Sequence, residues 1–450
     1  MADDSTLQDL GYQEELHRGL STWDLVVYGL VFIMPIAPMG IYGYVATESR
    51  GLPVLTYLIC AVGIFFTALA YSEMAKAVPT AGSVYGYASR AFGSRFGFLA
   101  GWMILIDYLL IPSLCYVFAS IALAGMIPAV PLWGWLVLFA LANTGINYRG
   151  VVVSARFNRV VLALQIVTLA LFLGFGIVAV STGSAGAGWT PKPIFDATNL
   201  DFRALMTAAS IAVLSFLGFD AISTLAEEAR GGGRSAGRAT LTVLFLVAGF
   251  FMLMTFVAGN LQPDWQALAA DPDNGFYNVA AIAGGKWLYT LCAGMTAFSW
   301  GITAAQASQS AVSRILFSMA RDRLLPAPLA QVHPRFRTPY VALLAVAVIS
   351  LVVGLIYQHD PSGITYIVNF GALTGFLCLH ASVVAHYMIR HRSRNYLVHL
   401  ICPLLGAIVI GYVWWGLDSQ AKLLGLGWVA VGGVVLAVNS ARGIRTRLDV

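Results

Sequence analysis

The chain has 450 residues, of which 59% are hydrophobic and only 10% are charged, with a formal net charge of +5. Soluble proteins carry about 25% charged residues, so this composition excludes an ordinary soluble domain. The positive charge does not indicate nucleic-acid binding, because the basic residues follow the loops between apolar stretches.

Twelve apolar stretches have about the length, roughly 20 residues, that crosses the hydrocarbon core of a bilayer. Backbone hydrogen bonding in lipid makes such stretches helices, since strands would need a closed barrel with an alternating pattern. With the N-terminus inside, 21 basic residues fall on the cytoplasmic side and 5 outside, which predicts cytoplasmic termini. The predicted spans are residues 22–46, 53–77, 98–126, 131–147, 159–182, 204–226, 239–260, 287–317, 339–357, 362–388, 397–416 and 420–440.

Four regions follow from these spans, and none of them is long enough outside the membrane to bury a core. Residues 1–20 are polar and acidic, so they predict a cytoplasmic tail and not a signal peptide. Residues 21–388 form a ten-helix transport core, residues 389–441 form helices eleven and twelve, and residues 442–450 form a second cytoplasmic tail. The predicted fold is therefore an all-α integral membrane protein.

The first span carries Pro35, Pro38, Gly40 and Gly43 in its middle. Each proline removes a helix hydrogen bond and the glycines relax the backbone. The sixth span contains Gly218, which weakens the helix at a corresponding point. Spans one to five and six to ten then form two halves of opposite topology, and paired interruptions in inverted halves indicate a transporter site. Simple packing kinks are the alternative.

Three acids lie within spans: Glu73, Asp107 and Asp220. Asp107 is ten residues into its span, so it lies roughly 15 Å deep at helical rise, and Asp220 closes the apolar stretch after Gly218. A charge at such depth costs at least a few kcal/mol, so it marks a partner, a cavity or a cargo. An acid hydrogen-bonded to a neighbouring backbone group or tyrosine is the structural alternative. All three are candidates for proton coupling.

The charge of the cargo follows from what surrounds these acids. No Lys or Arg lies in mid-membrane, so an anionic cargo would be repelled, whereas an ammonium group would supply the missing partner. Aromatic faces favour such cations, although a single aromatic residue is more often packing. The aromatic and polar candidates are Tyr42, Tyr108, Tyr116, Phe216, Phe219, Trp300, Asn369 and Gln306.

No phosphate-cradling loop, zinc-helix motif or nucleophile elbow occurs in the sequence. The five cysteines are scattered, with neither metal spacing nor a disulfide pattern. We therefore expect no cofactor, no metal and no enzymatic activity, and an ion gradient or exchange as the source of any uphill movement.

Three groups of residues resemble the amino acid–polyamine–organocation transporters over nearly the whole chain. The second span and the residues after it resemble the family's second-helix signature, residues 215–220 with Ala226, Glu227 and Glu228 resemble its sixth helix, and residues 313–339 resemble the stretch after its eighth helix. Residues 101–109 and 369–373 are most similar to the bacterial putrescine importers. The quoted motif residues are Tyr71, Ser72, Glu73, Met74, Pro79, Thr80, Ala81, Gly82, Ser83, Tyr85, Gly86, Tyr87, Ser313, Arg314, Met319, Ala320, Arg321, Asp322, Pro326, His333, Pro334, Thr338 and Pro339.

This resemblance implies the fold of the sodium-coupled leucine transporter, a five-plus-five inverted repeat with broken helices one and six. It implies proton-driven uptake of a cationic amine at the plasma membrane, with cargo between helices one, three, six, eight and ten. The residue that matches the family's cargo acid is Asp220. The implied cargo-contacting residues are Asp220, Phe216, Gly218, Phe219, Asp107, Tyr108, Pro38, Met39, Gly40, Tyr42, Trp300 and Asn369.

Two departures bear on cargo and coupling. Many family members hold a cargo carboxylate at a Gly-Ser-Gly break in helix one, whereas residues 35–40 here read Pro-Ile-Ala-Pro-Met-Gly, which favours an amine without a carboxylate. Some members carry a coupling Lys in helix five, and the matching position here is Gln165. The alternatives are an amino-acid permease or exchanger of the same fold, a channel or transport-inactive receptor, and an integral-membrane enzyme.

Overall fold

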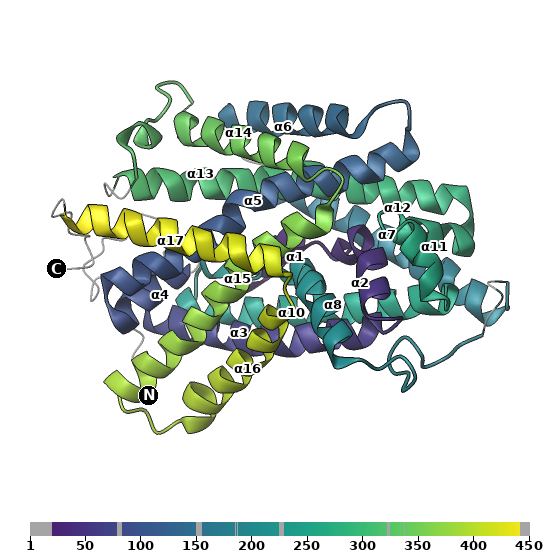
Figure 1. Ribbon diagram of the computed structural model, residues 1–450, viewed down its shortest axis with the longest axis horizontal. Helices are drawn as coiled ribbons and strands as arrows, with labels where there is room; N and C mark the ends of the chain where they lie inside the picture. Colours follow the sequence, from purple (N-terminus) through teal and green to yellow (C-terminus); the bar gives the residue numbers. More distant parts are fainter. Residues whose placement is uncertain are drawn as a thin grey trace.

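The computed structural model describes residues 20–78, 83–149, 155–184, 186, 188–224, 229–321, 325–336 and 338–441. Apart from Leu20, both predicted tails lie outside these residues, as do the motif residues at 79–82, 226–228 and 322. All the regular elements of the described residues are helices (Figure 1). The predicted all-helical class is confirmed for this part of the chain.

The first part of the chain runs from the broken first helix to the fifth predicted span. Its elements are α1 (Thr22–Ile33), the 3₁₀ helix η2 (Ala37–Gly40), α2 (Tyr42–Glu48), α3 (Pro53–Ala77), α4 (Ser83–Phe92), α5 (Ser94–Met126), α6 (Leu132–Tyr148) and α7 (Ala155–Ser181).

The second part begins with another broken helix. Its elements are α8 (Phe202–Ala212), the 3₁₀ helix η3 (Val213–Phe216), α9 (Ala221–Thr224), α10 (Gly232–Leu261), η4 (Trp265–Ala270), α11 (Gly275–Gly284), α12 (Lys286–Phe298), the π-helix η5 (Ser299–Ala304), α13 (Ala305–Arg321), η6 (Ala327–Ala330), α14 (Tyr340–Ile356), α15 (Pro361–Val383), the π-helices η7 (Val384–Arg390) and η8 (Leu397–Ile401), α16 (Cys402–Trp415) and α17 (Ser419–Ala441).

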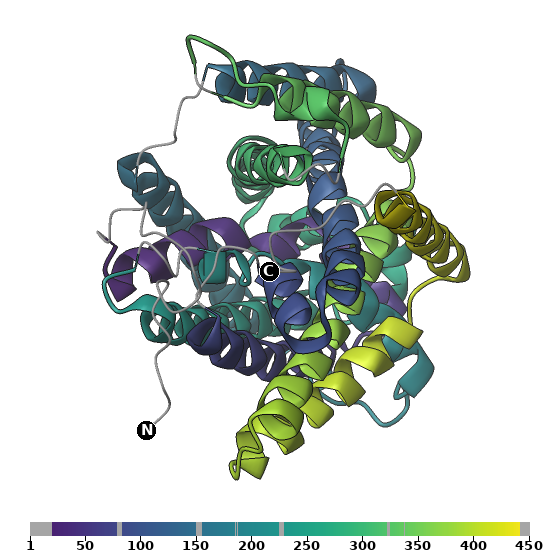
Figure 2. The same ribbon diagram turned by 90° about the vertical axis from the view of Figure 1, so that its left-hand side faces the viewer.

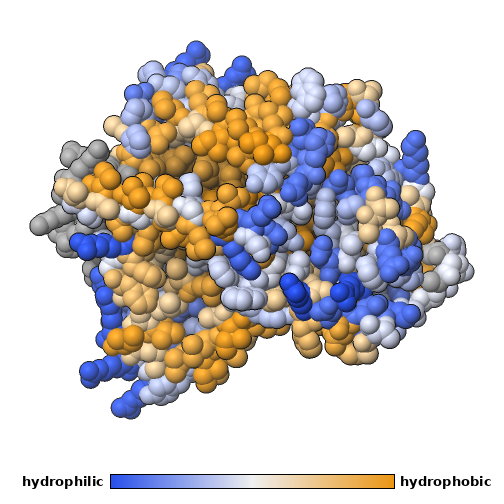
Figure 3. Space-filling model, viewed as in Figure 1, coloured by the Kyte–Doolittle hydropathy of each residue, from blue (hydrophilic) through white to orange (hydrophobic). Residues whose placement is uncertain are grey.

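Nine helices of the described residues are long and apolar enough to cross a membrane. Three predicted spans lie outside this set. α6 and α14 have 17 residues each, and the span at 287–317 is divided into α12, η5 and α13. Hydrophobic side chains spread over the surface near α14, α16 and α17 (Figure 3), and among the most exposed are Leu423, Ile408 and Ile356.

The two predicted interruptions are confirmed, and they meet. α1 ends at Ile33, where Met34 adopts a φ of 63° and Pro35 follows without an N–H. η3 ends at Phe216, and Gly218 has a φ of 104°, a region that suits glycine. A Cβ at Gly218 would lie 2.1 Å from Cδ1 of Phe32. The last turn of α1 therefore packs directly on the break after η3.

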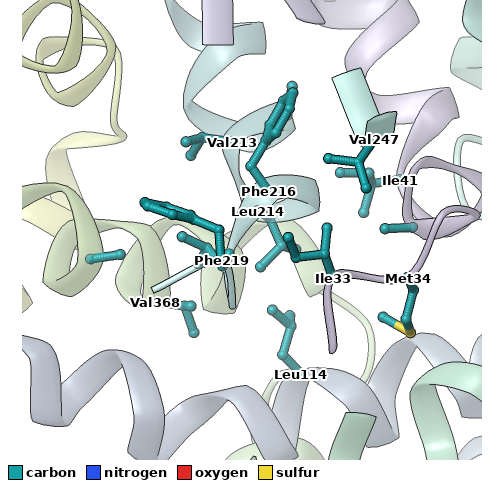
Figure 4. Packing of buried hydrophobic residues seen from close by; sticks show 14 of the residues in the cluster. Ile33, Met34, Ile41, Leu114, Val213, Leu214, Phe216, Phe219, Val247 and Val368 are labelled. Atoms are coloured by element: carbon teal, nitrogen blue, oxygen red, sulfur yellow. The ribbon is translucent and has the colours of Figure 1, made fainter. Parts of the chain in front are cut away.

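Buried apolar side chains from both breaks form the centre of the bundle (Figure 4). The contributing residues are Ile33, Met34 and Ile41 from the first break, Val213, Leu214, Phe216 and Phe219 from the second, Leu114 from α5, Val247 from α10 and Val368 from α15.

The helices pack in two groups around this centre. α10 packs on both α3 and α1, and α8 packs on α3 and α2. α5 packs on α15, α6, α13 and α14, and α6 and α14 lie side by side at one edge in both ribbon views (Figures 1 and 2). The predicted residues Asp107 and Asp220 lie where these groups meet.

Candidate functional site

Two buried carboxylates lie at the junction of the two groups. Asp107 is on α5, and Asp220 follows the break between η3 and α9; each is only 4% exposed. The hydroxyl of Tyr108 donates to Oδ2 of Asp220 at 2.8 Å, which joins α5 to the break. Asp107 and Asp220 lie within electrostatic range of each other. The structure brings the three predicted residues Asp107, Tyr108 and Asp220 together, and their binding of a cargo stays a prediction.

The break in the sixth predicted span shapes the surroundings of Asp220. The backbone amides of Gly218, Asp220 and Ala221 face its carboxylate, because Leu217 is extended and Gly218 turns the chain. The carbonyl of Asp220 accepts from the Ser223 hydroxyl at 2.6 Å. The carboxylate is thus held by backbone and Tyr108, while Oδ1 of Asp107 has no hydrogen-bond partner within the described ranges.

Neither carboxylate forms a salt bridge with any Lys, Arg or His that the structure describes. Two neighbouring carboxylates repel each other when both are charged in an apolar surrounding, and a cation between them removes that repulsion. The pair can therefore accept positive charge, either as protons or as cationic groups of a ligand.

An aromatic wall borders the acid pair. The ring centroids of Tyr71 and Phe219 are 5.6 Å apart, edge to face, and Phe376 packs on both at 6.1 and 5.4 Å. Tyr87 of α4 lies 6.1 Å from Tyr71. Tyr71 and Tyr87 both lie within electrostatic range of Asp220.

Sequence reasoning missed Tyr71, Tyr87 and Phe376 as site residues. Tyr71 and Tyr87 enter the sequence prediction only as residues of the family's second-helix signature. A usable signal was present, because Val84, Tyr87, Ala88 and Ala91 recur at helical spacing and are all buried. That periodicity places one face of α4 against the bundle.

A second group of predicted residues surrounds the first break. Pro38, Met39 and Gly40 form η2 and are buried. The indole of Trp300, in η5, packs on Phe118 of α5 with centroids 5.2 Å apart. A Cβ at Gly40 would lie 3.5 Å from Trp300 Nε1, so Trp300 and the first break are in contact. Nε1 of Trp300 has no hydrogen-bond partner in the part of the chain that the structure describes.

The other predicted residues have different neighbours. The ring of Phe216 packs on Tyr57 and Phe251, at 6.2 and 5.0 Å, and so faces α3 and α10. Tyr42 packs on Phe276 of α11 at 5.7 Å. Nδ2 of Asn369 donates to the Ser210 carbonyl at 2.6 Å, which secures α8 against α15.

Glu73 lies near the end of α3 and has charged neighbours. Nζ of Lys76 donates to its Oε1 at 2.6 Å, and Nε2 of His399 is 3.5 Å from Oε2. The hydroxyl of Tyr387 also donates to the Glu73 carbonyl at 2.9 Å. This environment differs from that of Asp107 and Asp220, which have no basic partner among the described residues.

Gln165, at the position of the family's coupling Lys, is buried on α7. Its Nε2 donates to the Ser299 hydroxyl at 3.0 Å, so it binds η5, the π-helix that carries Trp300. Within the described residues, no three His, Cys, Asp or Glu side chains are arranged to hold a metal ion. The five cysteines are unpaired.

Residues 271–275 contact the start of α2. The Tyr44 hydroxyl bonds to the Asp273 carboxylate, and a Cβ at Gly43 would lie 2.1 Å from the Pro272 carbonyl oxygen. Burial raises the pKa of the Asp273 carboxyl, and the neighbouring Asp271 acts in the same direction, while the Tyr44 hydrogen bond opposes it.

A helical bundle whose two broken helices meet beside a buried acid pair is typical of a membrane transporter. Residues 29–421 match the model of the amino acid permease family, and the chain belongs to this family. The resemblance to the amino acid–polyamine–organocation transporters, of which amino acid permeases are part, is confirmed.

The chain is 30% identical over 430 residues to a low-affinity putrescine importer of Escherichia coli, covering 94% of each protein. It is 26% identical to a branched-chain amino acid permease of Bacillus subtilis, over 93% of this chain and 90% of the permease. A methylthioribose transporter of Bacillus subtilis is 24% identical over 97% of this chain and 96% of the transporter. These similar proteins transport different small organic molecules.

Proposed function

We propose that this chain imports a small organic cation, putrescine or a related polyamine, as a secondary active transporter driven by the proton motive force. The observation that carries the proposal is the buried pair Asp107 and Asp220, which no described basic residue neutralises. An ammonium group is the ligand that such a pair favours, and the similarity to a putrescine importer supports the same cargo.

In this proposal, one ammonium group of the cargo binds Asp220 beside Tyr108 and Phe219. The face of an aromatic ring adds about 0.5–2 kcal/mol to the binding of a cation, and Tyr71 and Phe219 supply such faces. Asp107 then receives the second ammonium group or a proton. Two carboxylates thereby hold two positive charges, which leaves the occupied site electrically neutral.

The hydrogen bond between Tyr108 and Asp220 joins the two helix groups whose relative motion would expose the cargo site to one side of the membrane and then to the other. Tyr108 belongs to the group of α5, α6, α13 and α14, whereas Asp220 lies between η3 and α9, which pack on α1, α3, α8 and α10. We infer that the second group rocks against the first, with hinges at Met34 and Gly218. Cargo bound between Asp107 and Asp220 contacts both groups of helices, and it therefore favours the state in which the two groups are packed together around it.

We infer twelve membrane crossings, with both termini in the cytoplasm of a bacterium and the chain in its inner membrane. Adding α6, the α12–α13 helix and α14 to the nine helices that meet the length and hydropathy requirements gives that number. The bias of 21 basic residues against 5 supports the orientation. The matching interruptions at Met34 and Gly218 support a five-plus-five inverted repeat.

A second candidate function is amino-acid transport. The indole N–H of Trp300, buried beside Gly40 with no acceptor among the described residues, is a donor that would suit a cargo carboxylate. The similarity to a branched-chain amino acid permease points the same way. Against it, a carboxylate at the first break would lie in a site whose acids already repel anions.

Uptake of labelled putrescine into proteoliposomes that contain the purified protein separates these functions. We expect saturable uptake that an outside-acid pH gradient increases, that a protonophore abolishes, and that unlabelled diamines compete. Alanine, leucine and arginine, added separately, should compete weakly. Displacement of putrescine by these amino acids and not by diamines would favour the permease, and non-saturable flux without counterflow would favour a channel.

A further inference from the structure

The π-helix η5 separates the two regular parts of the eighth predicted span. A π turn inserts one extra residue into a helix and disturbs its regular hydrogen bonding, and such turns frequently occur at functional sites. In η5 the disturbed segment is Ser299–Ala304, and it carries Trp300. What stabilises this turn therefore determines where the Trp300 indole points.

The backbone of η5 is approached very closely at Gly301. A Cβ at this position would lie 2.5 Å from Cε1 of Phe139 on α6 and 2.8 Å from Cβ of Ala119 on α5. Glycine is required here because α6 packs against the main chain of η5. In the ribbon view, α6 lies along the edge of the bundle, outside the helices that meet at the acid pair (Figure 1).

Asn143 of α6 binds the carbonyl group that this close approach exposes. Its side chain is fully buried, and Nδ2 donates to the Gly301 carbonyl at 2.6 Å and to the Phe139 carbonyl of its own helix at 2.9 Å. A buried amide in an apolar bundle is unfavourable unless it is hydrogen-bonded. Its bond to Gly301 satisfies a carbonyl of the π turn and fixes α6 to it.

Two further hydrogen bonds, both to Ser299, stabilise the same π turn. Gln165 of α7 donates to the Ser299 hydroxyl at 3.0 Å, and the Thr303 hydroxyl donates to the Ser299 carbonyl at 2.6 Å. Trp300 follows Ser299 directly and precedes Gly301, so its indole is oriented by bonds on both sides. The indole in turn packs on Phe118 and borders Gly40 at the first break.

We propose that Asn143 is a positioning residue: by binding the Gly301 carbonyl it holds the π turn and orients Trp300 against the first break, and it thereby sets the affinity for cargo. Asn143 itself touches no cargo and acts through Trp300. The inference rests on the proposed function for the transported amine and on the sequence prediction that Trp300 contacts the cargo.

Asn143→Leu tests this proposal, because leucine keeps the number and branching of the side-chain heavy atoms and removes the donor. The matched control is Asn147→Leu. Asn147 lies one turn further along α6, and its Nδ2 donates to the Gln306 carbonyl at 3.1 Å and to Oε1 of Gln309 at 2.8 Å, both in the regular helix α13 beyond the π turn. Asn143→Ser is a second variant, since its short hydroxyl reaches the carbonyl of its own helix but not Gly301.

The first readout is fluorine NMR of protein labelled with fluorotryptophan. Trp300 is one of 11 tryptophans, and its resonance is assigned as the one missing in Trp300→Phe. We expect Asn143→Leu and Asn143→Ser to shift this resonance, and Asn147→Leu to leave it in place. An unshifted Trp300 resonance in folded, monodisperse Asn143 variants would overturn the proposal.

The second readout is putrescine uptake in a double-mutant cycle. We expect Asn143→Leu to raise KM about tenfold, the order expected for a hydrogen bond lost from a buried carbonyl, and to add less than about a twofold loss in the Trp300→Phe background. Independent, multiplying losses would contradict action through Trp300. If wild-type protein transports no amine, the proposed function fails, while a Trp300 resonance that responds to Asn143 alone still supports the positioning role.

Discussion

Replacing Asp220 with Asn tests the acid at the centre of the proposed site. Asn is nearly isosteric, and its side-chain oxygen can still accept the hydroxyl of Tyr108, which now lies 2.8 Å from Oδ2. The substitution therefore removes the negative charge while it retains the volume and the hydrogen bond. Its effect on folding should be small.

The expected loss of cargo affinity follows from the lost charge. A hydrogen bond to a charged group contributes about 1.5–3 kcal/mol, and about 1.4 kcal/mol corresponds to a factor of ten in affinity. Asp220→Asn should therefore weaken putrescine binding by between about tenfold and about a hundredfold. Tyr108→Phe removes only a neutral donor, worth about 0.5–1.5 kcal/mol, so its effect should be smaller.

The assay is equilibrium binding of labelled putrescine to purified protein, followed by uptake into proteoliposomes. Asp196→Asn is the matched control, because Asp196 is a partly exposed acid whose side chain accepts, among the described residues, from residues 198 and 199 of its own turn. It should bind putrescine as the unmodified protein does. Near-normal affinity in Asp220→Asn would remove Asp220 from the cargo site and refute this reasoning.

Three further predictions concern the residues that surround the site. Gly218→Ala should lower the melting temperature and abolish uptake, because alanine is disfavoured at a φ of 104° and its Cβ would overlap Phe32. The control Gly249→Ala, whose added Cβ has no neighbour within 4 Å, should preserve both, and equal melting temperatures of the two variants would contradict the role of the break. Trp428→Phe should lower the melting temperature with KM unchanged, because Trp102 and Trp428 each donate an indole N–H to the other's carbonyl, at 2.9 and 2.8 Å; a changed KM would show that α17 reaches the cargo site. Burial raises the pKa of Asp273, so the folded protein gains stability as pH falls through that raised pKa and loses it as pH rises. Asp273→Asn should therefore melt at a higher temperature than the unmodified protein near pH 7, and its melting temperature should change less between about pH 4 and about pH 7. Melting temperatures that change with pH in parallel in the two proteins would count against a buried Asp273.

Much of this architecture could be predicted from residues whose effects are local. Pro35 has no N–H and Gly218 adopts a positive φ, so both breaks follow from covalent structure. Asp107, Tyr108 and Asp220 stood out because charge inside an apolar stretch is costly. Their meeting depends on packing between α5 and the break, but helical depth and the family resemblance already indicated it.

The remaining features depend on contacts that no local pattern encodes. Phe216 and Phe219 are three residues apart, yet the 3₁₀ turn and extended Leu217 direct one ring toward Phe251 and the other toward Tyr71. η5 is also invisible in the sequence, because its neighbours come from another helix: Asn143 donates to the Gly301 carbonyl, and Phe139 packs on Gly301. Tyr87 comes within electrostatic range of Asp220 because α4 packs on α5 and α15.

A structure of the purified protein with bound putrescine tests the central claim most directly. We predict density for the ligand between the two breaks, with one nitrogen within hydrogen-bond distance of the Asp220 carboxylate and the chain of the ligand against Phe219 and Tyr71. Ligand density away from Asp107 and Asp220, with both carboxylates still bonded only to protein groups, would contradict the account.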